Sequence, residues 1–162
     1  MKTLKDIKLY ESGDELKTAG PTIFLAGPTP RSENVLSWRT KALVHFWDQG
    51  YQGSLFLPEP FINKSSNYEI NYHAQIEWED LALNLANIIL FWVPRELETM
   101  PGFTTNVEFG MWIRSGKVVY GRPDDTPKTK YLDYHANKNG VVVSSTLEQT
   151  VANALERLKN VC

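Results

Sequence analysis

Short, wholly apolar runs alternate along this chain with longer segments in which apolar residues recur at helical spacing. The run IILFWV at residues 88–93 is apolar at every position, which is typical of a parallel strand covered on both faces. In SWRTKALVHFWDQ, residues 37–49, the apolar positions follow a helical period instead, and Gly50 is suited to end the helix. Runs of the first kind, taken with a polar residue at one end, predict strands at residues 22–26, 54–58, 87–93, 117–121 and 141–144. Segments of the second kind predict helices at residues 37–49, 68–86, 106–115 and 145–159.

This alternation of strands and helices predicts an α/β protein whose parallel strands are joined by right-handed crossovers. Five strands in a chain of 162 residues favour a flavodoxin-like three-layer sandwich with a five-stranded parallel sheet of order 2-1-3-4-5. We expect a polar loop at 59–68 and an irregular surface segment at 122–140. Residues 21–162 are expected to form a single domain. Residues 1–20 are polar and charged, and we expect them to form an N-terminal arm or an edge hairpin.

The predicted strand order places a ligand crevice between the first and third predicted strands. In open parallel sheets, ligands bind outside the carboxyl ends of the strands, where the strand order reverses. The loop after the first predicted strand is GPTPRS, residues 27–32, and the loop after the third, residues 94–106, leads to Glu108. If the strand order is right, both loops flank one crevice and Glu108 lies beside it.

Two interpretations of Glu108 remain open from the residues alone. Thr105 and Glu108 have the spacing of a capping box, in which a Thr at the helix N-cap and a Glu three residues later satisfy each other's backbone donors. Ser145 and Glu148 match the same pattern at the last predicted helix. Capping is the more common role of a Thr and a Glu at this spacing. A helix N-terminus also favours the ionised carboxylate, which is the form that a nucleophile requires.

Composition and charge narrow the class of protein. Apolar residues make up 42% and charged residues 22% of the chain, and the net charge is −2, so we expect a globular protein that binds no polymeric nucleic acid. The longest apolar run is too short to span a membrane. The N-terminus lacks the apolar core of a signal peptide, and Cys162 is the only cysteine, which suits a reducing cytoplasm. The three histidines are scattered, so we expect neither a metal site nor a cofactor.

Five segments, in this order and with these gaps, resemble the nucleoside 2-deoxyribosyltransferase superfamily, and most closely its nucleoside 2-deoxyribosyltransferase-like branch. These segments are IFLAGPTP, SWRTKAL, EWEDLALNLANIILFWVP, NVEFGMW and GKVVYGRP. They cover about residues 22–125. The resemblance implies a flavodoxin-like fold, a homo-oligomer, and cleavage of the N-glycosidic bond of a nucleoside or deoxynucleoside.

The resemblance also assigns roles to residues. The Glu of a Glu-apolar-Gly motif is the nucleophile in this family, and here it is Glu108. An acid on the helix before the third strand handles the nucleobase, and counting back from Asn87 places it at Glu79. Without the resemblance, Glu79 would be interpreted as part of a charged helix face with Glu77 and Asp80. The loop after the first strand lines the sugar side, which here includes Gly27, Pro28 and Thr29.

Two positions depart from the family pattern. Several members carry an aromatic hydroxyl in the first strand that holds the nucleophile, where this chain has Phe24. Another acid is often found about six residues before the nucleophile, where this chain has Gly102. These departures favour hydrolysis or a modified substrate over efficient deoxyribosyl transfer.

The chemistry implied by the resemblance is a double displacement. Glu108 attacks C1′ while Glu79, with a pKa raised by burial beside Trp78 or Trp92, protonates the departing base. A second base or water then releases the sugar with retained configuration at C1′.

Other residues of the two loops are candidates for substrate binding. Arg31 and Ser32 could hold a 5′-phosphate, since their donors suit phosphate oxygens. Trp92 could stack on a base, and Asn106 precedes the nucleophile by two residues. Arg122 could contact an anion or lie at the surface.

Two alternative functions remain. A non-catalytic module could bind a nucleotide in the same crevice, which the missing hydroxyl at Phe24 favours. A flavodoxin-like redox or signalling domain ranks last, because GPTPRS lacks the Ser/Thr-rich run expected of a flavin phosphate loop.

Overall fold

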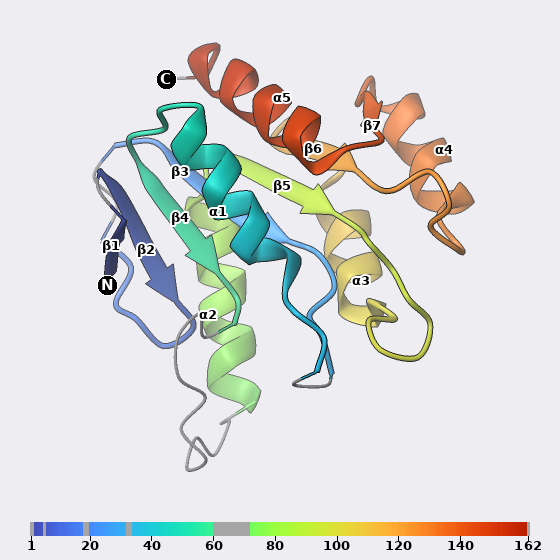
Figure 1. Cartoon of the computed structure of the whole chain (residues 1–162), viewed down its shortest axis with the longest axis horizontal. Helices are drawn as coiled ribbons and strands as arrows, with labels where there is room; N and C mark the ends of the chain where they lie inside the picture. The colour runs from blue at the N-terminus through green and yellow to red at the C-terminus, as the bar shows by residue number, and fades with distance from the viewer. Residues whose placement is uncertain (1, 5, 18–19, 32–33, 60–71, 162) are drawn as a thin grey trace.

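The computed structural model describes residues 2–4, 6–17, 20–31, 34–59 and 72–161 (Figure 1). Its sheet has seven strands in the order β1-β2-β4-β3-β5-β6-β7. The strands are β1 (Lys2–Leu4), β2 (Ile7–Glu11), β3 (Thr22–Ala26), β4 (Ser54–Leu57), β5 (Ile88–Trp92), β6 (Val118–Gly121) and β7 (Val143–Ser144). The helices are α1 (Trp38–Asp48), α2 (Tyr72–Leu85), α3 (Phe103–Trp112), α4 (Lys130–Lys138) and α5 (Leu147–Lys159).

The predicted flavodoxin-like topology is confirmed, and the sheet is wider than predicted. The five predicted strands correspond to β3, β4, β5, β6 and β7, and they pair in the order β4-β3-β5-β6-β7, which is the expected 2-1-3-4-5. Strand β2 adds a sixth parallel strand beside β4. Strand β1 pairs antiparallel with β2 at the outer edge. The first twenty residues therefore contribute two strands to the sheet.

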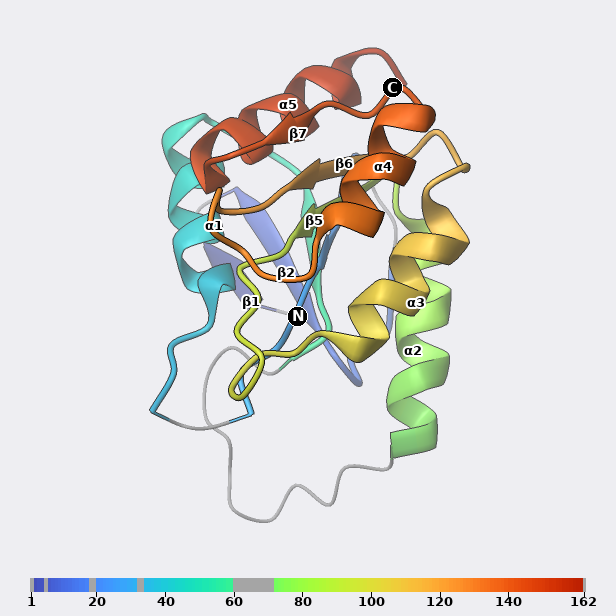
Figure 2. The same ribbon diagram turned by 90° about the vertical axis from the view of Figure 1, so that its right-hand side faces the viewer.

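Helices cover both faces of the sheet, and alternate residues of each strand point to opposite faces. Helices α1 and α5 pack on one face, together with Ile88, Leu90 and Trp92 of β5. Helices α2, α3 and α4 pack on the other, together with Ile89 and Phe91. Figure 2 shows this arrangement, with α1 and α5 on one side of the strands and α2 and α3 on the other. The division decides which side chains of β3 and β5 can face a ligand near α2 and α3.

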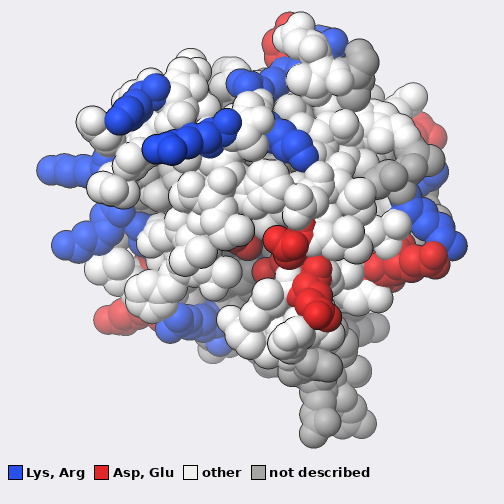
Figure 3. Space-filling view, turned by 180° about the vertical axis from the view of Figure 1, so that it is seen from behind, with Lys and Arg blue, Asp and Glu red and all other residues white. Residues whose placement is uncertain are grey.

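The face that carries α2, α3 and α4 is seen in Figure 3. Lys and Arg side chains gather on one part of this face, a few Asp and Glu side chains lie near its middle, and much of the surface between them is uncharged. Within the described residues, none of the helices combines the length and the apolar character that crossing a bilayer requires.

Helix α3 begins earlier than predicted, and the capping box at Thr105 and Glu108 is wrong. Its N-cap is Gly102, which has φ 67° and makes no side-chain cap hydrogen bond. A left-handed backbone is accessible to glycine at little cost, so the loop turns sharply there and the helix starts at Phe103. Thr105 is consequently a buried residue of the first turn, and Glu108 lies in the second turn.

Two further expectations about helices need correction. The box at Ser145 and Glu148 is shifted by one residue, because Thr146 is the N-cap of α5 and accepts a hydrogen bond from the Gln149 backbone N–H. The segment 122–140 is not wholly irregular, since it contains α4. This helix buries Leu132 and Ala136, four residues apart, and so short an apolar stripe among polar residues gives a weak pattern.

Candidate active site

A cavity of about 430 Å³ opens at the carboxyl end of the sheet, where β3 and β5 lie side by side. Its walls come from the loop after β3, the end of β4, helix α2, the loop after β5 and the start of α3. The lining residues are Gly27, Pro28, Thr29, Arg31, Pro58, Tyr72, Gln75, Ile76, Glu79, Pro101, Gly102, Phe103, Thr104, Thr105 and Glu108. The cavity therefore lies at the reversal of strand order, as open parallel sheets favour.

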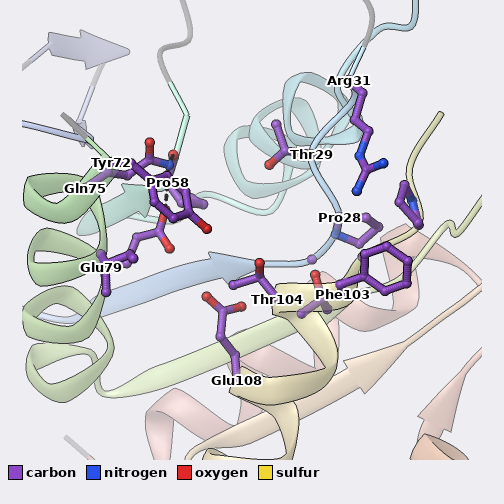
Figure 4. Close-up of a pocket in the computed structure, with 15 residues that line it drawn as sticks. Pro28, Thr29, Arg31, Pro58, Tyr72, Gln75, Glu79, Phe103, Thr104 and Glu108 are labelled. Carbon is purple, nitrogen blue, oxygen red and sulfur yellow. Dashed lines mark hydrogen bonds between the residues drawn. The ribbon is translucent and has the colours of Figure 1, made fainter. Parts of the chain in front are cut away.

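Two carboxylates from different helices face this cavity. Glu79 extends from α2 and Glu108 from α3, and Figure 4 shows their carboxylate oxygens directed toward the same space. Glu79 Oε1 accepts a hydrogen bond of 2.8 Å from Gln75 Nε2. The same amide nitrogen lies 3.2 Å from the Pro58 carbonyl oxygen, so Gln75 holds Glu79 against the end of β4.

The pKa of Glu108 is raised to about 7, first by burial and then by the negative charge of Glu79, while the positive charge of Arg39 lowers it. Burial also raises the pKa of Glu79, and the hydrogen bond from Gln75 and the charge of Arg39 oppose that rise. From the sequence, a helix N-terminus is expected to favour ionised Glu108. In the second turn of α3 this effect is small, so desolvation and the second carboxylate dominate. The pair thus retains a proton close to neutral pH.

Gly27 occupies a position that no other residue could fill without rearrangement. It follows β3 with φ 145°, and a Cβ atom there would lie 2.1 Å from the Trp92 backbone oxygen and 2.9 Å from Trp38 Cζ2. The missing side chain lets the loop after β3 pass directly over the end of β5. That close passage brings Pro28 and Thr29 to the cavity wall.

Two neighbouring side chains of α1 hold this loop in place through hydrogen bonds to its carbonyl oxygens. Trp38 Nε1 donates a 3.0 Å hydrogen bond to the Pro28 carbonyl oxygen. Arg39, whose side chain is fully buried, donates to the carbonyl oxygens of Leu25 and Gly27. Arg39 is not among the residues that the sequence predicts for the site. Its position three, four and seven residues before Ala42, Leu43 and Phe46, which are buried on α1, places it on the apolar stripe of that helix and could have drawn attention to it.

The chain matches the model of a family described as nucleoside 2-deoxyribosyltransferase like, over residues 20–126. This match spans more than half of the chain. The chain belongs to this family. The matched range contains the loop after β3, both cavity carboxylates and all of α3. No curated protein was found to match the chain.

In this nucleoside 2-deoxyribosyltransferase-like chain, most of the candidate residues meet in the cavity. Glu79, Glu108, Gly27, Pro28, Thr29 and Arg31 line it. Arg31 is exposed at the rim, where its guanidinium carbon lies 5.6 Å from the centre of the Phe103 ring, and its backbone N–H donates to the Thr99 carbonyl oxygen. Ser32 lies outside the described residues.

Trp92 and Phe24 do not line the cavity, so their assignment to substrate binding needs correction. Trp92 points to the face of the sheet that α1 and α5 cover, and it is only 6% exposed. Phe24 points to the opposite face and is fully buried in the core under α2 and α3. Trp78, also proposed to desolvate Glu79, is buried in that core and donates to the Asp14 carbonyl oxygen.

Asn106 lies on a different face of α3 from Glu108. Two residues correspond to about 200° around a helix, so these side chains cannot share one wall. Asn106 Oδ1 accepts a hydrogen bond from Arg95, and Asn106 lines a second hollow between α3 and α4. Arg122 forms a 2.8 Å ion pair with Asp133 and is absent from the described lining of the cavity.

The polar side chains in the cavity are two glutamates, a glutamine, three threonines, Tyr72 and an arginine at the rim. In the parts of the chain that the structure describes, no group of three or more His, Cys, Asp or Glu side chains could hold a metal ion. The arrangement can supply a nucleophilic oxygen and a proton from two different helices.

Proposed function

We propose that this protein cleaves the N-glycosidic bond of a nucleoside or nucleotide through a covalent glycosyl-enzyme, and passes the sugar to another base or to water. The observation that carries the proposal is the pairing of Glu79 and Glu108 in one cavity, with the pKa of both raised. A cavity of about 430 Å³ also falls within the range of small-molecule sites. Membership in the nucleoside 2-deoxyribosyltransferase-like family supports the choice of substrate.

In the first step, an ionised Glu108 oxygen attacks C1′ as the bond from C1′ to the base nitrogen breaks. The proton on Glu79 passes to the departing base, so the base leaves neutral and Glu79 becomes ionised. The product is an ester between Glu108 and C1′. General acid assistance of this kind is typically worth ~10²–10⁴-fold.

In the second step, a new base or a water molecule attacks C1′ from the side that the first base left. Glu79 accepts the proton of this nucleophile, and the ester bond to Glu108 breaks. Two inversions leave the configuration at C1′ unchanged. The absence of a hydroxyl at Phe24 and of an acid at Gly102 favours water over a second base.

Product analysis tests this proposal. The protein is incubated with deoxynucleosides and with their 5′-phosphates, with and without a second free base. Exchange of bases identifies a transferase, and free sugar or sugar phosphate identifies a hydrolase. Glu108→Ala should abolish both products, and turnover retained by that variant would contradict the assignment of the nucleophile.

A narrower version of the same proposal is that the substrate carries a 5′-phosphate. Arg31 lies exposed at the cavity rim beside Phe103, where its guanidinium could bind phosphate oxygens. Arg31→Gln should then raise KM for a nucleotide about tenfold or more and leave KM for the matching nucleoside unchanged. An equal effect on both substrates would exclude a phosphate contact.

Non-catalytic binding of a nucleotide is the alternative function. The specific observation in its favour is that β3 offers no hydroxyl to hold Glu108, because the position is occupied by Phe24, whose side chain is buried in the core. In that case Glu108→Gln would leave ligand affinity largely intact, and no product would form with any nucleoside or nucleotide.

The protein is also proposed to form a homo-oligomer. Phe103, Val107 and Met111 recur every four residues along α3 and are 70%, 62% and 64% exposed, so they form an apolar ridge beside the cavity mouth. Burial of such a ridge against a second copy would be favourable. Light scattering should give a mass of at least twice 18.5 kDa, and a monomer at micromolar concentration would contradict this.

A further inference from the structure

Arg39 is a buried cation that the proposed chemistry has not used. Its side chain is fully buried in the first turn of α1. Nε donates to the Leu25 carbonyl oxygen at 3.0 Å, and one terminal nitrogen donates to the Gly27 carbonyl oxygen at 2.8 Å. The other terminal nitrogen donates to Thr29 Oγ1 and to Glu59 Oε1, each at 3.1 Å.

These contacts fix the loop that forms one wall of the cavity. Leu25 is in β3, Gly27 follows it, and Thr29 lines the cavity, so a single guanidinium spans the turn from the strand to the site. The planar fork of an arginine can reach three acceptors along a bent backbone, whereas an ammonium group cannot reproduce that geometry. The Arg39 guanidinium also lies 4.7 Å from the Trp38 ring, and Trp38 holds Pro28 in the same loop.

The charge of Arg39 also acts on the two carboxylates. It lowers the pKa of Glu79 and of Glu108, against burial and mutual repulsion. Its paired carboxylate is Glu59, just after β4, which also accepts a hydrogen bond from Ser37. The other ionisable groups at the cavity are Arg31 on the loop after β3 and Tyr72 on α2, and both are exposed. Arg39 is therefore the positive charge that is held in place by the fold.

We propose that Arg39 is the positioning residue of this site, holding the loop after β3 in its place and providing the fixed positive charge that acts on Glu79 and Glu108. The catalytic part of this inference rests on the proposed glycosidic cleavage. Arg39 itself is enclosed by protein groups and is expected to touch neither the sugar nor the base.

Three variants separate the charge of Arg39 from its geometry. Arg39→Gln removes both, and Arg39→Lys keeps the charge but loses the fork. Lys41→Gln removes an exposed charge from the same helix and serves as the matched control. We expect Arg39→Gln to lower kcat/KM about 100-fold, the size of effect that misplacement of about 1 Å can cause, and to move the pH profile to higher pH. Arg39→Lys should lower the rate and leave the profile close to that of the wild type.

The titration of the two carboxylates is measured without turnover, by ¹³C NMR of labelled glutamate. Glu79→Gln and Glu108→Gln assign the two signals. Arg39→Gln should raise both pKa values, and Lys41→Gln should leave them unchanged. If the wild type cleaves no glycosidic bond but these shifts occur, the proposed function fails while the electrostatic role of Arg39 stands. Shifts in Arg39→Gln no larger than those in Lys41→Gln would overturn that role.

Glu59→Gln provides a test that does not depend on replacing a buried arginine. It keeps an oxygen to accept from Arg39 and removes the compensating charge, so the pKa of Glu108 should fall and the pH profile should move to lower pH. If the Arg39 variants do not fold, the pKa of Glu108 in Glu59→Gln decides whether the inference holds. An unchanged or higher pKa of Glu108 in Glu59→Gln would overturn the inference.

Discussion

At the scale of single residues, the proposed function depends on the proton that Glu79 and Glu108 together retain close to neutral pH. Both groups are partly removed from water, and each raises the cost of ionising the other. The form able to react carries a proton on Glu79 and a charge on Glu108. Because the two groups titrate as a pair, the pKa values observed in a rate profile belong to the pair.

The profile of kcat/KM against pH should be bell-shaped. At acid pH both carboxyls are protonated and Glu108 cannot attack. Above a pH of about 7, the pKa to which burial and the second carboxylate raise Glu108, the pair has lost its last proton and none remains for Glu79 to pass to the base. Initial rates from pH 4 to pH 9 measure this, with Glu79→Gln as the comparison. Glu79→Gln should lose the alkaline limb together with ~10²–10⁴-fold of rate. A wild-type rate that stays flat from pH 6 to pH 9 would contradict the role of Glu79.

The same titration predicts that Glu108 destabilises the empty protein at alkaline pH. Its pKa is raised from 4.5 to about 7 on folding, so the folded state binds the proton more tightly. The associated stability is fully present below pH 4.5 and is lost as the pH rises through 7. Glu108→Gln should therefore increase the free energy of unfolding at pH 8 by about 2 kcal/mol, allowing for partial exposure.

Urea unfolding at pH 8 and at pH 4 measures this difference, which should nearly vanish at pH 4. Glu148→Gln, which replaces an exposed glutamate of α5, should not stabilise the protein at either pH. A Glu108→Gln protein that is less stable than the wild type at pH 8 would show that Glu108 is ionised and well solvated.

At the scale of elements, the loop after β3 and the start of α3 decide the geometry of the cavity. Nearly continuous apolar runs identified β3 and β5, because strands covered on both faces contain few polar positions. The start of α3 could not be predicted in the same way. Thr105 and Glu108 have the spacing of a cap, but the left-handed backbone of Gly102 starts the helix one turn earlier.

Gly27→Ala should disrupt this loop severely. The added Cβ would lie 2.1 Å from the Trp92 backbone oxygen, so the loop or β5 must move. We expect a loss of at least about 3 kcal/mol in the free energy of unfolding and no detectable activity. Gly140→Ala is the matched control, because Gly140 also has a positive φ but has open space around it. Gly140→Ala should lower the free energy of unfolding by about 1 kcal/mol and retain activity. Equal effects of the two substitutions would contradict the close approach of Gly27 to the Trp92 backbone oxygen.

At the scale of the whole molecule, strand order was the most informative prediction. It placed the loops after β3 and β5 beside one crevice, and the cavity lies there. The two strands added by residues 2–11 extend the far edge and do not alter this site. The sequence could not indicate which face of β5 Trp92 occupies, since residues on both faces of that strand are apolar. The position of Arg39 on the apolar stripe of α1 marks it as a buried residue, but the sequence could not show its partners, which are two backbone oxygens and the side chains of Thr29 and Glu59.

The proposed function requires a covalent bond between Glu108 and the sugar, and this bond can be trapped. The protein is mixed with a deoxynucleoside or its 5′-phosphate, quenched in acid within milliseconds, digested and analysed by mass spectrometry. The peptide containing Glu108 should gain the mass of one sugar unit in the wild type and should gain nothing in Glu108→Gln. Product formation with an unmodified Glu108 peptide at every quench time, or the same adduct in Glu108→Gln, would contradict the proposed bond.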